Sequence, residues 1–402
     1  MTPTKNILMV INTLGNGGAE RAVSLISRHL STTDCRVQIM CLERNIFDND
    51  NFYQLPDTIP IHYLTHEKST HSGLKKLLQL PILAWQLMQF IEQHQISVVQ
   101  SHLFRASYVS AMAKLWMKLR RRATPTLQMV TPGQITYYDQ EGLLGKVNLF
   151  LIRWCYPLSS LLIFKSKEMQ AQANQRLPNL TQSAQTVIYN PYDIEHIQQQ
   201  ASLPISFVFD ANKRYLVSVG RLIKLKRTET ILNVLPQLPD EVELILVGNG
   251  AEEDHFKQIA QQNQIAHRVH FVGAQKNPFA WVAHANVFIL SSETEGFPNV
   301  LAEAMICQTP VIASDCISGP REILAPETDP LNHLQKGDAF EITPNGILYA
   351  VGDEVQLLKA ITYLLANPEK AQTLADRAFL RAHDFSLATI MAQYKHHLCP
   401  QA

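Results

Sequence analysis

The feature of this sequence that most constrains its fold is a repeated alternation between short β-branched, apolar runs and longer helical patterns. In the first half the runs occur at 7–11, 36–41, 97–100, 126–130 and 161–164. A second series occurs at 215–219, 243–247, 269–272, 287–290 and 310–313. Short buried strands separated by helices are typical of βαβ units, which build parallel sheets. The pattern therefore predicts an α/β protein with two successive series of alternating strands and helices.

The chain divides most naturally between the two series. Its 402 residues exceed what one hydrophobic core usually serves. Asn190-Pro191 marks a turn, and the Gln-rich segment that follows, up to Asp210, is loosely patterned. We expect an N-terminal domain over 1–190 and a second domain from 191 onward. The alternative is an ordinary loop within one large sheet.

Charge is distributed unevenly although the formal net charge is zero. Residues 1–190 contain 19 Lys and Arg against 11 Asp and Glu, and the remainder contains 16 against 24. This asymmetry indicates that the first half meets an anionic surface, either nucleic acid or a membrane. An apolar fraction of 46% with 17% charged residues excludes disordered, collagen-like and coiled-coil proteins.

Cysteine usage and hydropathy predict a cytoplasmic protein. The six cysteines form no CxxC pair and show no metal-ligand spacing, so we expect reduced thiols and no disulfide. The apolar run 7–11 is too short for a signal-peptide core and fits a buried first strand. The stretches 77–91 and 277–292 are too short to span a bilayer.

A glycine loop follows the first predicted strand. Gly17 and Gly18 precede a helical pattern, and such a loop lets backbone N–H groups approach an anion at a helix N-terminus. The order of glycines is not GxGxxG, and the loop lacks the lysine of a phosphate-binding P-loop. A plain strand-to-helix turn is an equally good interpretation.

Two cations follow the first strand of the second half. Gly220-Arg221 ends this strand and Lys226 comes five residues after Arg221. Ligands of open α/β sheets bind at the carboxyl ends of strands, and a guanidinium with an ammonium suits a diphosphate. A solvated basic turn is the alternative.

The sharpest motif lies between 291 and 303, where a strand ends in a polar loop and an apolar helix begins. Glu303 lies within that helix, so its burial requires hydrogen bonds, for example to ribose hydroxyls. Glu295 lies where a bound sugar would sit. Backbone N–H groups of the intervening segment can hold phosphate or sugar oxygens, and the segment comprises Gly296, Phe297, Pro298, Asn299 and Val300. The alternative is one capping and one solvated glutamate.

Glu295 and Glu303, together with Gly220-Arg221-Leu222 and Lys226, resemble the retaining family 4 glycosyltransferases of the GT-B fold. The resemblance covers nearly the whole chain. Further matching elements are the loop at 17–20, Ser101-His102, Asn190-Pro191, Val247-Gly248-Asn249-Gly250, Ser314-Asp315, 319–324 and 345–348. The resemblance implies two Rossmann-like doubly wound parallel-sheet domains, 1–190 and 191–383, facing a central cleft. It also implies a last helix, 384–402, that crosses back to the N-terminal domain.

The resemblance assigns roles to individual residues. Arg221 and Lys226 grip the donor diphosphate, Glu303 holds the ribose, Glu295 contacts the transferred sugar, and His102 contacts the donor sugar near the reacting carbon. Donor-binding residues are completed by Gly17, Gly18, Gly220, Asn249, Gly296, Phe297, Pro298, Asn299 and Val300. A structural role is the alternative for a lone histidine after a strand. Where many relatives carry a further histidine this chain has Gln134.

The implied reaction transfers a hexose or N-acetylhexosamine from a UDP-sugar, with retention, to a lipid-linked, lipopolysaccharide or capsule glycan. The departing phosphate takes the acceptor proton. We expect no cofactor and no metal site, because Arg221, Lys226 and helix N-termini can stabilise the leaving charge. Alternatives are a nucleotide-sugar epimerase or hydrolase on the same fold, a silent sugar-nucleotide sensor, and a basic nucleic-acid-binding protein. No nucleic-acid motif supports the last of these.

Residues 112–122 combine five cations with Trp, Leu and Met in helical phase. This pattern is typical of an interfacial amphipathic helix and predicts peripheral docking on the anionic cytoplasmic face of the inner membrane. A solvated helix face is the alternative. For 74–91 we favour a buried core helix, and for 325–340 a surface loop.

Overall fold

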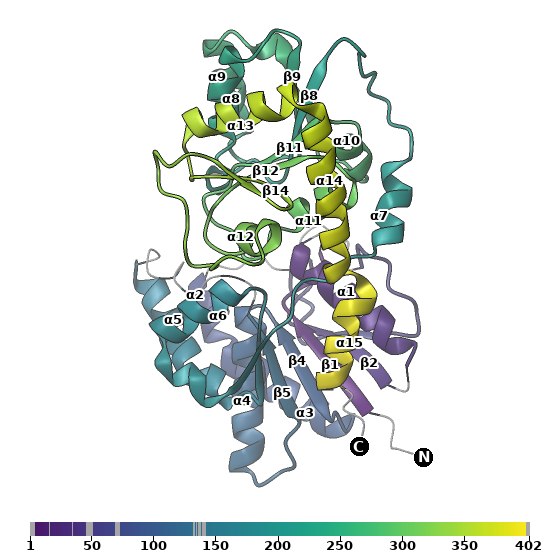
Figure 1. Ribbon diagram of the computed structural model, residues 1–402. Helices are drawn as coiled ribbons and strands as arrows, with labels where there is room; N and C mark the ends of the chain where they lie inside the picture. Colours follow the sequence, from purple (N-terminus) through teal and green to yellow (C-terminus); the bar gives the residue numbers. More distant parts are fainter. Residues whose placement is uncertain are drawn as a thin grey trace. The chain divides into compact units, whose positions relative to one another are not determined.

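The computed structural model describes residues 5–15, 17–33, 35–45, 51–68, 73–131, 133, 135, 138 and 142–398. The chain forms two compact units, residues 1–191 with 387–402 and residues 192–386, each built around one sheet of seven strands (Figure 1). The divisions fall after Pro191 and after Ser386. The unit that contains residues 1–191 is called unit 1, and the unit of residues 192–386 is called unit 2.

The sheet of unit 1 is entirely parallel, in the order β3-β2-β1-β4-β5-β6-β7. Its strands are β1 (Lys5–Ile11), β2 (Cys35–Cys41), β3 (Ile61–Tyr63), β4 (Val98–His102), β5 (Thr126–Val130), β6 (Leu161–Phe164) and β7 (Ala184–Val187). The central strands β1, β4 and β6 are buried on both faces, which explains why β1 and β6 are largely apolar, whereas β4 buries three polar residues.

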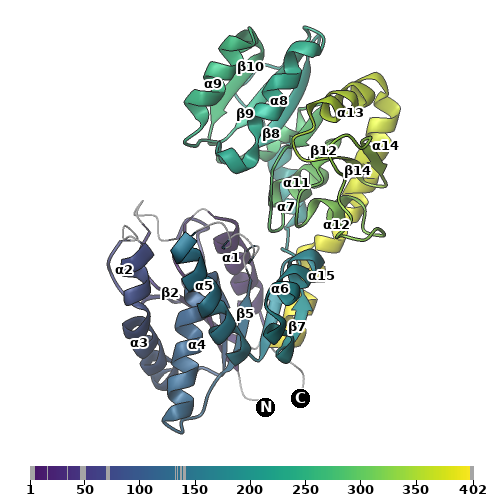
Figure 2. The same ribbon diagram turned by 90° about the vertical axis from the view of Figure 1, so that its left-hand side faces the viewer.

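Helices cover both faces of this sheet (Figures 1 and 2). One layer comprises α2 (Gly73–Leu78), α3 (Leu80–Gln93), α4 (Phe104–Leu119) and α5 (Gly142–Cys155), with α6 (Lys167–Arg176) following β6. The other contains α1 (Gly18–Ser31) and the last helix, α15 (Leu387–Leu398), whose inward residues Ile390, Met391, Tyr394 and Leu398 are fully buried. Alternate residues of the strands face the two layers, as Val98 and Val99 do.

The sheet of unit 2 follows the order β10-β9-β8-β11-β12-β14-β13. Its parallel strands are β8 (Arg214–Val219), β9 (Val242–Val247), β10 (Val269–Gly273), β11 (Val287–Leu290), β12 (Val311–Ser314) and β14 (Gly346–Tyr349), and β13 (Glu341–Thr343) is antiparallel to β14. The helices are α7 (Ile194–Ala201), α8 (Thr228–Val234), α9 (Glu253–Gln262), α10 (Phe279–Ala283), α11 (Asn299–Ile306), α12 (Pro320–Leu324), α13 (Glu354–Ala366) and α14 (Pro368–Ala382).

Both sheets reverse their strand order at a central pair, β1 beside β4 and β8 beside β11. Such a switch point opens a crevice at the carboxyl ends of the strands, where ligands of doubly wound folds bind. The predicted α/β class with two Rossmann-like sheets is confirmed. The short strands β3, β7, β13 and β14 were not indicated by the apolar runs.

The prediction about the cysteines is contradicted at one position. Cys35, the first residue of β2, is disulfide-bonded, so the prediction of reduced thiols throughout is wrong at this position. Cysteine spacing could not reveal it, because a disulfide depends on which side chains the fold brings together. Cys41, Cys155, Cys307 and Cys316 are free thiols. None of the helices in the described ranges is long and apolar enough to cross a membrane.

Candidate active site

In unit 2 the carboxyl ends of β8 and β9 are held together by backbone packing. The Leu222 N–H donates to the Asn249 carbonyl at 2.9 Å, and the Gly220 N–H donates to Val247 at 2.9 Å. A Cβ on Gly248, whose φ is +141°, would overlap the Gly220 carbonyl oxygen, and one on Gly250 would overlap that of Leu222. These glycines therefore fix the loop that carries Arg221, and both Arg221 and Asn249 are exposed at its surface.

Lys226 and Glu295, 69 residues apart in sequence, meet at the same edge of the sheet. Lys226 Nζ lies 2.5 Å from Glu295 Oε1, and the Ser292 hydroxyl donates to that oxygen at 2.6 Å. The lysine side chain keeps 24% of its surface exposed and the glutamate 12%. An anion that approaches this ammonium from solvent competes with Glu295 for it, which couples binding of a phosphate to the position of the carboxylate.

Hydrogen bonds anchor the loop between β11 and α11 and keep Glu295 beside Lys226. The Ser291 hydroxyl donates to the Lys226 carbonyl at 2.7 Å, and the Glu293 N–H donates to Leu225 at 2.8 Å. On its other side the Glu295 N–H donates to the Ile317 carbonyl at 3.1 Å. Backbone bonds, rather than the ion pair alone, therefore hold the glutamate in place.

The predicted donor-binding segment 296–300 leads directly into α11. Phe297 and Pro298 are buried, whereas Gly296, Asn299 and Val300 are partly exposed, and Asn299 accepts a hydrogen bond from Tyr192 Oη at 2.6 Å. Pro298 has no N–H, so the donors at this helix start belong to the other four residues. Glu303 is 6% exposed within α11, as its apolar surroundings predicted.

Beside this site lies a buried ion pair that the sequence patterns did not assign. Arg321 Nη2 donates to Asp315 Oδ2 at 2.6 Å, and the Leu334 N–H donates to the same oxygen at 2.7 Å. Burial opposes ionisation of Asp315, but hydrogen bonds from His333 and Arg321 outweigh it and lower the pKa of this carboxyl below its ordinary value. The segment 325–340, expected to be a plain surface loop, is thus tied to the end of β12.

Residues with left-handed backbone flank several of these positions. Leu103 follows His102 with φ 73°, Arg227 follows Lys226 with φ 46°, and Ser318 has φ 67°. Such conformations cost non-glycine residues free energy and concentrate at functional sites. Three such residues lie in the loops after β4, β8 and β12, and the others lie in turns elsewhere in the chain.

In unit 1 the predicted residues lie at the carboxyl ends of neighbouring strands. Gly17 precedes α1 with an extended backbone and its carbonyl accepts from Tyr53 Oη at 3.1 Å, while Gly18 opens the helix. His102 ends β4, adjacent to β1. The structure thus gathers Gly17, Gly18 and His102 in one unit, and the remaining predicted residues in the other.

His102 is only 2% exposed, and its Nε2 lies 3.0 Å from Gln100 Oε1. Burial and the nearby charge of Lys165 lower the pKa of this imidazole to about 3. The ring is therefore neutral at physiological pH. It can exchange hydrogen bonds with a sugar but cannot supply positive charge to a phosphate.

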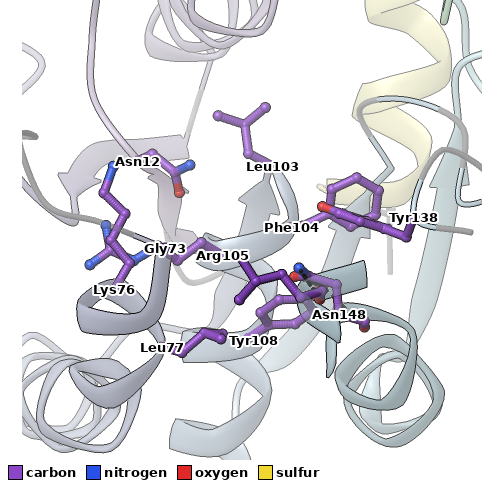
Figure 3. Close-up of a pocket in the computed structure, with 11 residues that line it drawn as sticks. Asn12, Gly73, Lys76, Leu77, Leu103, Phe104, Arg105, Tyr108, Tyr138 and Asn148 are labelled. Carbon is purple, nitrogen blue, oxygen red and sulfur yellow. Dashed lines mark hydrogen bonds between the residues drawn. The ribbon is translucent and has the colours of Figure 1, made fainter. Parts of the chain in front are cut away.

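A pocket of about 360 Å³ opens beside Leu103, between the ends of α2, α4 and α5. Figure 3 shows Asn12, Lys76 and Arg105 on one side of it, and Phe104 and Tyr138 on the other. Its remaining lining includes Leu77, Leu103, Tyr108 and Leu144. Sequence reasoning missed this pocket, because its residues come from separate elements and only the charge excess of the first half hinted at it.

The two cations of the pocket share one buried carboxylate. Arg105 Nη1 lies 2.8 Å and Lys76 Nζ 3.6 Å from Glu43 Oε1, and Glu43 is 2% exposed. Arg105 Nη2 donates to Gln79 at 2.9 Å, which fixes the guanidinium plane. Lys76 and Arg105 are the charged side chains among the described residues that line the pocket, and such a lining favours an anion with apolar atoms beside it.

The predicted amphipathic helix differs from the observed one. α4 ends at Leu119, its residues Ala113 and Met117 are buried in the core, and Lys114 donates to the Leu158 carbonyl at 3.0 Å. The three arginines 120–122 follow the helix and are exposed. The basic surface is therefore the end of a core helix, since the sequence pattern cannot tell an apolar face that packs inward from one that meets lipid.

Two family models match the chain. The model described as "Glycosyltransferase Family 4" matches residues 16–196, and that described as "Glycosyl transferases group 1" matches residues 200–381. Together they account for most of the sequence. The chain belongs to the family 4 glycosyltransferases.

Similar proteins agree with this membership. A Campylobacter jejuni protein named N-acetylgalactosamine-N,N'-diacetylbacillosaminyl-diphospho-undecaprenol 4-alpha-N-acetylgalactosaminyltransferase is 26% identical over 380 residues, 94% of this chain and 95% of that protein. A second C. jejuni enzyme, a GalNAc-alpha-(1->4)-GalNAc-alpha-(1->3)-diNAcBac-PP-undecaprenol alpha-1,4-N-acetyl-D-galactosaminyltransferase, is 22% identical over 96% of each chain. The crystal structure of Anabaena Alr3699/HepE in complex with UDP matches with a TM-score of 0.75 at 22% identity, covering 98% of this chain and all of that one. The structural match shows the GT-B fold.

Proposed function

We propose that this glycosyltransferase moves a hexose or N-acetylhexosamine from a UDP-sugar to a lipid-linked or lipopolysaccharide-type glycan, with retention and without a metal ion. The observation that carries the donor side is the meeting of Lys226 and Glu295 beside Arg221 at the switch point of unit 2. In doubly wound folds this edge is where nucleotides bind.

The charges at this edge fit the chemistry of the leaving group. Arg221 and Lys226 offer a guanidinium and an ammonium to the diphosphate, Glu303 holds the ribose, and Glu295 contacts the transferred sugar. As the bond from the anomeric carbon to the diphosphate breaks, negative charge grows on the diphosphate oxygen, and the two cations stabilise it. UDP is favoured because the Anabaena protein of the same fold was crystallised with UDP.

The anomeric configuration is retained if the acceptor attacks the anomeric carbon from the same face as the departing diphosphate. The acceptor oxygen then bonds to the anomeric carbon, and its proton passes to the departing diphosphate oxygen. Gly17, Gly18 and neutral His102 contribute hydrogen bonds in this proposal. No protein side chain becomes covalently attached.

The pocket of unit 1 is our candidate for the phosphate-bearing part of the acceptor. Lys76 and Arg105 suit a diphosphate, and Leu144 at the pocket is itself 44% exposed. Leu74 and Leu78 of α2 and Leu143 of α5 are between 62% and 79% exposed. A site that joins cations to exposed leucines suits a lipid diphosphate, the class of acceptor that the two C. jejuni enzymes' names describe.

Unit 1 also exposes large apolar side chains along its α2–α5 layer, in a pattern that fits a lipid surface. Besides the leucines near the pocket they include Ile82, Trp85, Leu119, Phe150 and Trp154. Arg120 stacks over the Trp85 ring at 4.1 Å, at the basic end of α4. Apolar and cationic groups on one layer favour peripheral docking on an anionic membrane, and we propose the cytoplasmic face.

Product analysis tests the reaction. Purified protein with EDTA, a panel of UDP-sugars and a polyprenyl-diphosphate-linked glycan should yield an acceptor longer by one sugar, with the donor's anomeric configuration. Free sugar without a longer acceptor would instead support a hydrolase, and an isomerised nucleotide-sugar an epimerase. An inverted linkage would contradict retention, and activity only with added metal would contradict metal independence.

A further inference from the structure

Three polar side chains interrupt the face of unit 1's sheet that α15 covers. Gln100 and His102 lie two residues apart on β4, and Gln128 on β5 is the register partner of Gln100. All three are at most 2% exposed. Polar groups buried this deeply are almost always hydrogen-bonded, so their mutual orientation is determined by the bonds that they make.

The bonds form one chain that starts in the C-terminal helix. Gln128 Nε2 lies 2.8 Å from the His397 carbonyl oxygen, and Gln100 Nε2 lies 2.8 Å from Gln128 Oε1. Gln100 Oε1 lies 3.0 Å from His102 Nε2. The chain therefore runs from α15 across two strands to the imidazole at the switch point.

Its direction is set at the helix end. A main-chain carbonyl only accepts hydrogen bonds, so Gln128 must turn its amide nitrogen toward His397 and its oxygen toward Gln100. Gln100 must then turn its nitrogen toward Gln128 and its oxygen toward His102. An oxygen at that position requires a proton on His102 Nε2. Reversing either amide would place two acceptors or two donors face to face.

We infer that α15, acting through Gln128 and Gln100, holds His102 in its Nε2–H tautomer and leaves Nδ1 as a hydrogen-bond acceptor. Gln100 and Gln128 are positioning residues. Nδ1 has no hydrogen-bond partner in the described part of the chain, so a donor-sugar hydroxyl can use it. This last step rests on the proposed function, but the tautomer itself does not.

The charge state of the ring agrees with a single fixed proton. The charge of nearby Lys165 lowers the pKa of His102, and Lys165 Nζ donates to Tyr394 Oη of α15 at 2.8 Å. Burial together with this neighbour keeps the imidazole neutral, so one nitrogen carries the only proton. Which nitrogen does so is then decided by Gln100.

The tautomer can be measured in the full chain by two-bond proton–nitrogen NMR on protein labelled with ¹⁵N-histidine, with His102→Asn used to assign the signal. We expect wild type to show only the Nε2–H form between pH 5 and 9. Gln128→Lys places a donor opposite the Gln100 amide nitrogen, so Gln100 should turn its oxygen toward the new ammonium and its nitrogen toward His102, which shifts His102 to Nδ1–H. Gln100→Leu should give a mixture of both forms.

Two variants separate this relay from general disturbance. Gln100→Glu keeps an acceptor oxygen at His102 and should retain Nε2–H. Gln185 is a partly buried glutamine on β7 of the same sheet, and it forms a hydrogen bond with Asn174 of α6. Gln185→Leu should leave the tautomer of His102 unchanged.

An Nδ1–H signal in wild type would overturn the inference. So would an unchanged tautomer in both Gln100→Leu and Gln128→Lys, provided that melting curves show folded protein. If the tautomer shifts while turnover of UDP-sugar does not, the relay stands and the contact of His102 with the donor fails.

Discussion

The two units place opposite kinds of polar group at the carboxyl ends of their sheets. In unit 2, Lys226 and Glu295 form an ion pair at 2.5 Å and are partly exposed. In unit 1, His102 is buried and neutral, and burial of the nearby Lys165 lowers the pKa of that ammonium to about 7. In our proposal unit 2 supplies charge to the donor, whereas His102 of unit 1 supplies an oriented neutral hydrogen bond.

The largest expected effect is on the charged edge. Lys226→Ala should lower kcat/KM for the UDP-sugar by about 100- to 1,000-fold, because it removes a cation that faces the charge of the leaving diphosphate. Lys224→Ala, an exposed lysine of the same turn, is the matched control. An equal kcat/KM for the two variants would contradict the proposal that Lys226 of unit 2 supplies charge to the donor.

The buried edge should respond to pH instead. Native Lys165 has a pKa of about 7 against 10.5 in an unfolded chain, so between these values the unfolded state binds more protons and stability rises with pH. Lys165→Met lacks this dependence. From pH 6.5 to 9 the unfolding free energy of wild type should rise relative to the variant by about 2 to 3 kcal/mol.

Urea unfolding followed by tryptophan fluorescence measures this difference, since Trp85, Trp116 and Trp154 all lie in unit 1. Lys359→Met, an exposed lysine of α13, should give a curve parallel to wild type. Parallel curves for Lys165→Met as well would mean that Lys165 is not buried as described.

The exposed arginines at the end of α4 allow a test of membrane binding by unit 1. Replacing Arg120, Arg121 and Arg122 by Gln should weaken partitioning to anionic vesicles by about 100- to 200-fold, given about 1 kcal/mol for each of the three cations near the lipid surface. Cosedimentation at constant ionic strength measures it, with neutral vesicles as reference. Unaltered partitioning would leave the solvated-surface interpretation of these arginines.

The smallest effect is expected in the pocket. Arg105→Lys keeps the charge but loses the fork held by Gln79, and should raise KM for a diphosphate-linked acceptor by about fivefold to tenfold while leaving KM for the UDP-sugar unchanged. Lys75→Arg, on the exposed side of α2, controls for surface charge. A parallel change in both Michaelis constants would argue against a dedicated acceptor site.

The sequence indicated features that depend on local pattern. Ten apolar runs predicted the strands that form the centres of both sheets, and the polar loop before Glu303 predicted a buried carboxylate on a short helix. Contacts between distant segments were different. Neither the hydrogen bond from Gln128 to His397 nor the shared use of Glu43 by Lys76 and Arg105 leaves a periodic signal, because each joins elements that only the fold brings together.

Some misses had a visible trace. Gln100 and Gln128 are buried polar residues in parallel strands, and a buried glutamine there requires a hydrogen-bond partner. The pattern at 112–122 was ambiguous for a physical reason, since an apolar helix face packs equally well on a core or on lipid. The disulfide of Cys35 left no trace in the spacing.

The most direct test of the account is calorimetric binding of UDP and GDP, with EDTA present, to wild type and to Arg221→Ala. We predict micromolar binding of UDP to wild type that is lost in the variant, because Arg221 holds the diphosphate at the exposed edge of unit 2. UDP binding that is unchanged by the substitution would contradict the placement of the donor, and binding of GDP alone would contradict the assignment of the nucleotide.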